Sequence, residues 1–127
     1  MNSVRTIEQK RSEFAYNKVS EVKEKAFSKD YKSLVKNFPM MVLKNGLLQT
    51  VVFLQAKGKN HHDALLKHIK EYLSHASPLS LHFDDTLSEY LSKIDVAKYI
   101  NITQDILDFA KWLSRYTEAL IEDKQEE

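Results

Sequence analysis

The sequence predicts an all-α protein, a compact single-domain helical bundle of about five to six helices. Only 2 glycines and 2 prolines occur in 127 residues, too few turn-forming residues for a protein with many strands. Apolar residues instead recur at helical spacing along most of the chain. A chain of this length suits one domain that buries about two thirds of its unfolded surface. We therefore predict one helical domain over residues 1–127, with an acidic tail that frays from about residue 123.

The first predicted helix extends from about Ser3 to Phe27. Its apolar positions keep helical spacing: Ile7, Ala15, Val19, Val22 and Ala26. Arg11, Lys18 and Lys25 form a second row, seven residues and hence about 10.5 Å apart along one side of the helix. This row indicates a basic ridge that could contact phosphates. The alternative is that long basic side chains flank and cover an apolar seam while their charges stay in water.

The central part of the chain predicts two helices. A short helix begins near Asp30, and Asn37-Phe38-Pro39 interrupts it because a residue before proline avoids the α region. Pro39 then begins a longer helix that ends near Lys57, with Gly58 as a left-handed cap. We interpret Gly46 inside this helix as a close approach of another backbone or a ligand, with ordinary close packing as the alternative.

The same stretch is not expected to cross a membrane, because Lys44 lies near its centre and costs about 2.5 to 3.5 kcal/mol on insertion. The N-terminal residues lack the apolar core of a signal peptide. We therefore predict a cytoplasmic protein.

The second half of the chain predicts three further helical segments. Asn60 caps a helix over His61–His75, and Leu79–Phe83 forms an ordered loop. Asp84 or Asp85 begins a helix that ends at Ile94, and Asp95 starts a short turn through Ile100. Thr103 caps the last helix, whose seam consists of Ile106, Phe109, Leu113, Tyr116 and Leu120.

No catalytic apparatus is evident in the sequence. There is no cysteine, no glycine-rich phosphate loop and no Gly-x-Ser-x-Gly turn. Four histidines recur every seven residues: His61, His68, His75 and His82. Residues seven apart on a helix stand about 10 Å apart, so one ion cannot collect all four. We expect no metal, no cofactor and no enzymatic activity.

Charge divides the chain into two regions. Residues 1–76 carry 14 Lys and Arg against 7 Asp and Glu, a balance of +7, whereas residues 77–127 carry 5 against 11, a balance of −6. The basic region favours binding to a polyanion. The candidate phosphate contacts are Arg11, Lys18, Lys25, Lys44, Asn45, Lys57 and Lys59. We expect Phe38, Phe53 and Phe109 to be core residues.

Trp112 is a candidate for a protein interface. It lies at the edge of the terminal seam, beside the polar residues Lys111 and Arg115. Burial of the indole at the seam edge is the alternative.

Two segments carry a family resemblance. They are NFPMMVLKNGLLQTVVFLQAKGK and, about fifty residues later, ITQDILDFAKWLSRYTEAL. The most specific features are Pro-Met before Asn45-Gly46-Leu47, the following Phe53 and Lys57, and the Phe109, Trp112, Tyr116 spacing. With these features the chain resembles the small helical subunit of the type III-B CRISPR (Cmr) effector complex.

The resemblance implies a non-catalytic structural subunit in antiviral defence. Such a subunit stacks with copies of itself beside the backbone subunits that hold the guide RNA. Its implied partners are the other Cmr subunits, copies of itself, and the target RNA strand or guide–target duplex. Without the resemblance, a generic helical adaptor that binds only protein is the rival hypothesis.

Overall fold

The computed structural model describes residues 4–123 and confirms the all-α fold class. Six helices follow one another in this part of the chain: α1 Ile7–Val22, α2 Ser28–Asn45, α3 Leu47–Lys57, α4 Asn60–His75, α5 Leu87–Lys93 and α6 Val96–Leu120. The predicted helix start at Ser3 and the tail beyond Asp123 lie outside the described residues.

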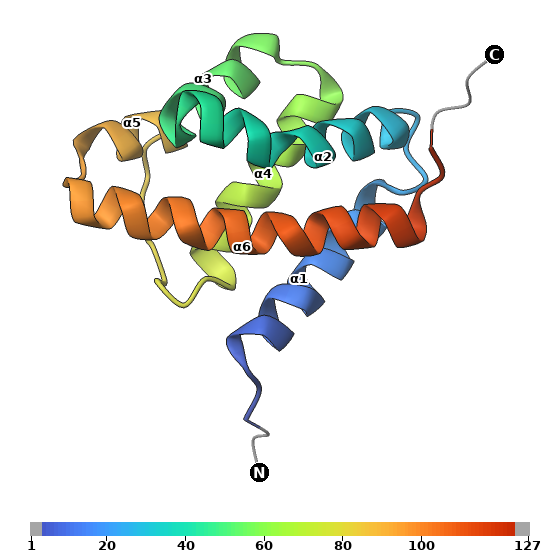
Figure 1. The fold of residues 1–127 in the computed structure, drawn as a ribbon, viewed down its shortest axis with the longest axis horizontal. Coiled ribbons are helices and arrows are strands. Elements are labelled where there is room, and N and C mark those ends of the chain that lie inside the picture. The colour runs from blue at the N-terminus through green and yellow to red at the C-terminus, as the bar shows by residue number, and fades with distance from the viewer. Residues whose placement is uncertain (1–3, 124–127) are drawn as a thin grey trace.

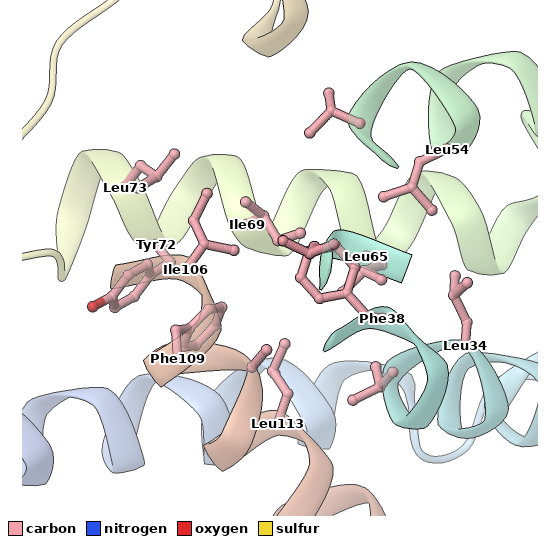
Figure 2. Packing of buried hydrophobic residues seen from close by; sticks show 14 of the residues in the cluster. Leu34, Phe38, Leu54, Leu65, Ile69, Tyr72, Leu73, Ile106, Phe109 and Leu113 are labelled. Atoms are coloured by element: carbon pink, nitrogen blue, oxygen red, sulfur yellow. The ribbon is translucent and has the colours of Figure 1, made fainter. Parts of the chain in front are cut away.

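The long helix α6 organises the bundle. It runs the length of the molecule with α2 alongside, while α1 crosses it at one end and α3 and α5 lie toward the other (Figure 1). Helix α4 packs against α2, α3 and α6. Figure 2 shows buried side chains from α2, α3, α4 and α6 converging between these helices. The predicted seam of α6 is confirmed, since Ile106, Phe109 and Leu113 are fully buried.

Helix α1 begins at Ile7 and ends at Val22, so it is shorter than the predicted helix from about Ser3 to Phe27. Thr6 and Gln9 form a reciprocal capping box, in which each side chain accepts a hydrogen bond from the other residue's backbone N–H at 3.0 and 2.8 Å. The helix ends at Val22, so Lys25 lies in the turn before α2.

The predicted break at Pro39 is wrong, and the break occurs at Gly46 instead. Helix α2 continues through Pro39 because Val35, Phe38 and Val42 are buried along one face on both sides of it. Packing therefore outweighs the local cost of the proline.

Gly46 separates α2 from α3 with φ 82° and ψ 161°, a backbone region that only glycine occupies readily. A Cβ there would lie 3.7 Å from the Tyr99 hydroxyl, an ordinary contact. Glycine is thus required at position 46 because of its backbone conformation. The expectation that another backbone or a ligand approaches closely at Gly46, inside one helix, is wrong. Beyond the break, the Leu48 N–H donates to Tyr99 Oη at 2.9 Å.

The N-terminal caps of α5 and α6 differ from the predicted ones. Thr86, and not Asp84 or Asp85, accepts a hydrogen bond from the Glu89 N–H and caps α5. Asp95 caps α6, which is one helix of 25 residues. Thr103 lies inside this helix, where its hydroxyl donates to the Tyr99 carbonyl and so does not cap a separate helix.

The remaining boundaries agree closely with the sequence. Gly58 ends α3 in the left-handed conformation, with φ 60° and ψ 13°, as predicted. Helix α4 begins at Asn60 itself, so the N-cap is Lys59, one residue earlier than expected. Leu79–Phe83 is a loop. No helix among residues 4–123 combines the length and hydrophobicity that crossing a bilayer requires.

Candidate nucleic-acid interface

Arg11 is buried and does not form part of an exposed basic ridge. Its side chain donates to Tyr72 Oη, Asp105 Oδ1 and Glu8 Oε1, each at 2.9 Å. Tyr72 also donates to Asp105 Oδ1 at 2.6 Å, and the Ser77 hydroxyl donates to the other oxygen of Asp105. These contacts join α1 to α4, α6 and the loop after α4.

The charge of Arg11 is retained in this network. Burial alone would lower the pKa of the guanidinium, but its hydrogen bonds to Tyr72 and Asp105 raise it above the ordinary value. The guanidinium and Asp105 therefore form an internal ion pair, and Arg11 is not presented to an outside phosphate.

Lys18 is also engaged within the molecule. Its Nζ lies 3.0 Å from Glu21 Oε2 and 3.3 Å from Glu71 Oε1, and only 12% of its side chain is exposed. Lys25 is exposed beyond the end of α1. The predicted ridge of three free cations is thus wrong, since the structure leaves only Lys25 of the three open.

The exposed candidates gather instead around α3. Lys44 and Asn45 end α2, while Gln49, Phe53 and Lys57 follow at spacings of four residues along α3. Residues four apart share one face of a helix. An open hollow joins the two helices and is lined by Asn37, Met40, Met41, Lys44, Asn45, Gln49, Thr50 and Phe53.

Phe53 is the aromatic residue of this surface. Its side chain is 39% exposed, and Lys57 Nζ lies 5.6 Å from the ring centroid. The ring also meets the buried His62 edge-on, with centroids 5.9 Å apart. The prediction that Phe53 is a core residue is therefore wrong, whereas Phe38 and Phe109 are fully buried as expected.

Lys59 follows Lys57 by two residues, in the connection between α3 and α4. Lys59 is exposed one residue before the helix, and the His61 ring lies 4.1 Å from that of His62. Burial lowers the pKa of His62, and His61, Lys57 and Lys59 lower it further. The contributions of Lys57 and Lys59 show that these two ammonium groups lie near the His62 ring. We name the exposed set the α3 strip, which consists of Lys44, Asn45, Gln49, Phe53, Lys57 and Lys59.

The chemistry of the α3 strip suits a single-stranded nucleic acid. Lysine ammonium groups attract the phosphates of a nucleic acid independently of its nucleotide sequence, and an exposed aromatic face can stack on a base. Amide side chains such as Asn45 and Gln49 add hydrogen bonds to the backbone or to base edges. The strip presents all three kinds of group as exposed side chains.

Comparison with known proteins identifies the family. The family model described as CRISPR-associated protein (Cas_Cmr5) matches residues 7–120, which is nearly the whole chain. The chain belongs to the Cmr5 family. The resemblance of the two quoted segments is thereby confirmed.

Two curated relatives of this Cmr5 family member carry the name CRISPR system Cmr subunit Cmr5. The protein from Thermotoga maritima is 32% identical over 127 residues, covering 98% of this chain and 92% of the relative. The protein from Thermus thermophilus is 28% identical over 120 residues, covering 94% and 100%. A crystal structure of a Cmr5 family protein from Thermus thermophilus, also 28% identical, matches the fold with a TM-score of 0.80 over 94% of this chain and 100% of that one.

Trp112 occupies a half-buried position in this Cmr5 fold. Its Nε1–H donates to Glu8 Oε2 at 2.9 Å, and its ring lies 6.3 Å from that of Tyr116. An open hollow beside it is lined by Glu8, Pro39, Asp108, Lys111, Ser114 and Arg115. Lys111 and Arg115 are exposed, so the indole stands between two accessible cations. The role of these three residues in an interface remains a prediction.

Sequence reasoning missed Gln49 and Phe53 as surface residues. The signal was present, because the spacing of Gln49, Phe53 and Lys57 places the phenylalanine on the polar face of α3. The hydrophobic neighbours of Phe53 concealed that spacing.

Proposed function

We propose that this chain is a non-catalytic structural subunit of a type III-B Cmr effector complex that contacts target RNA through the α3 strip. Membership of the Cmr5 family supports the place in the complex. The observation that supports the RNA contact is that Lys44 and Phe53 line one open hollow and that the Lys57 ammonium lies over the Phe53 ring. Its partners are then the other Cmr subunits, copies of itself and the target strand.

The absence of a catalytic role is part of this proposal. Among the described residues, Ser77 and Asp105 form a buried hydroxyl–carboxylate contact that superficially resembles a nucleophile and its base. Asp105 is already paired with Arg11 and accepts from Tyr72 and Ser77. These hydrogen bonds join three separate segments of the chain, and we assign this group a role in stabilising the fold.

Charge reversal of the strip tests the RNA contact. We expect Lys44→Glu/Lys57→Glu/Lys59→Glu to weaken target-RNA binding by the assembled complex by about tenfold or more near 0.1 M salt, because phosphate attraction becomes repulsion. The effect is multiplied when several copies line one strand. Filter binding or fluorescence anisotropy at two salt concentrations measures it.

The matched control reverses three exposed lysines outside the strip, as Lys10→Glu/Lys23→Glu/Lys67→Glu. An equal loss in both variants would indicate a net-charge effect alone. Unchanged binding in the strip variant, with normal assembly, would favour the adaptor hypothesis.

We also propose that Trp112 contributes to packing between subunits. Trp112→Ala should impair stacking of copies more than it lowers the stability of the single chain, because the indole is half-buried and borders an open hollow. Sedimentation velocity measures assembly, and thermal unfolding measures stability. Trp112→Phe keeps an aromatic ring without the bond to Glu8 and should retain most assembly. Equal assembly of the alanine variant would contradict this role.

A further inference from the structure

Three side chains that could bind a metal converge at one side of the bundle, away from the α3 strip. Glu21 lies at the end of α1, and His68 and Glu71 lie one turn apart on α4. One ligand atom from each residue lies within 4.8 Å of the other two. The seven-residue recurrence of histidines plays no part here, since His68 is the only histidine in this cluster.

The imidazole of His68 is held in position for ligation. Its side chain is 3% exposed, and Nδ1 shares a 2.7 Å hydrogen bond with the Tyr31 hydroxyl. This bond leaves Nε2 facing the carboxylates, with Glu21 Oε1 at 3.7 Å, too far for a hydrogen bond. A second residue that fixes the other ring nitrogen is typical of metal-binding histidines.

The two carboxylates supply negative charge that is only partly compensated. Glu71 Oε1 is buried and has no hydrogen-bond partner of good geometry. The Lys18 ammonium lies 3.3 Å from this oxygen and 3.0 Å from Glu21 Oε2. Lys18 therefore places one positive charge where the two carboxylates meet, on a flexible stem that can swing toward solvent.

We propose that Glu21, His68 and Glu71 bind one divalent transition-metal ion of the zinc class, with the ammonium of Lys18 displaced on binding. One imidazole nitrogen and two carboxylate oxygens are ligands that Zn²⁺ accepts at about 2.0 to 2.2 Å, with water in the fourth position. Glu21 is half-exposed and can close the remaining distance by rotation of its side chain. The ion would join the end of α1 directly to α4.

Calorimetric titration of the chelator-treated full chain with ZnCl₂ at pH 7.5 tests the site. We expect Glu21→Gln and Glu71→Gln each to weaken zinc binding by about tenfold or more, since each removes an anionic ligand. Lys18→Met should strengthen it by about tenfold, because the competing ammonium is lost. Glu24→Gln, an exposed residue just beyond the end of α1, is the matched control and should bind like the parent.

X-ray absorption of the zinc-loaded Lys18→Met protein gives a second readout, which we expect to show one imidazole among oxygen ligands. Binding unaffected by all three substitutions at Lys18, Glu21 and Glu71, or a spectrum with two or more imidazoles, would assign zinc to other histidines and overturn the proposal. Absence of binding by Lys18→Met at millimolar ZnCl₂ would also overturn it. Circular dichroism of each variant verifies that the fold is retained.

Discussion

Asp105→Ala is expected to lower the free energy of unfolding by about 3 to 5 kcal/mol, because it leaves the buried guanidinium of Arg11 without its anionic partner. Tyr72 and Ser77 lose their acceptor in the same substitution. Urea unfolding followed by circular dichroism measures the change. The effect is large because this one carboxylate accepts hydrogen bonds from three separate segments of the chain.

Two further variants show whether this loss comes from the network. Asp108→Asn is the matched control: Asp108 lies on the same helix, its carboxylate is 3.7 Å from Arg11, and its side chain is 27% exposed. We expect it to cost less than about 1 kcal/mol. Arg11→Met in the Asp105→Ala background should cost little more, since the stranded charge is then removed. Additive losses would show that the two residues act independently.

Phe38→Ala should mainly lower the stability of the fold, whereas Phe53→Ala should mainly weaken RNA binding. Phe38 is fully buried where α2 faces α4 (Figure 2), so its removal is expected to cost about 3 to 5 kcal/mol of unfolding free energy. Phe53 is 39% exposed, and its removal should cost about 1 kcal/mol or less. The same Phe53 variant should weaken RNA binding by the assembled complex by about tenfold, the loss of one stacked base.

Chemical unfolding of both variants and RNA titration of the complex containing Phe53→Ala check this pair. Phe53→Leu retains an apolar side chain without a ring and separates stacking from general hydrophobic contact. If Phe53→Ala bound RNA like the parent, base stacking would have no part in the strip.

The sequence predicted the helices better than the breaks between them. Gly58 is followed by a polar cap region and ends α3 as expected, since only local backbone geometry decides that position. The predicted break was placed at Pro39 and the predicted helix interior at Gly46, whereas the structure shows the opposite. The continuation of α2 through Pro39 depends on burial of Phe38 against distant helices, which the local sequence does not reveal. Met40 and Leu43, on the same helix, are exposed, whereas Phe38 and Val42 are buried.

In the candidate site, too, the sequence predicted exposure where it depends on neighbouring residues and failed where it depends on a distant helix. Lys57 and Lys59 are exposed, as expected of charged residues beside a helix end. Arg11 satisfied every local criterion for an exposed ridge, yet its partner Asp105 lies 94 positions further along the chain. A spacing within one helix cannot reveal an acidic residue on another helix, so the burial of Arg11 required the tertiary structure.

The break between α2 and α3 at Gly46 determines the geometry of the α3 strip. Lys44 precedes it, and Gln49, Phe53 and Lys57 follow it, so the angle between two helices fixes how far the first cation stands from the second. A residue that forced continuous helix through this point would redirect Lys44 without touching any charge. If the α3 strip binds RNA as proposed, such a substitution would change the spacing of the phosphate contacts in a chain of unaltered net charge.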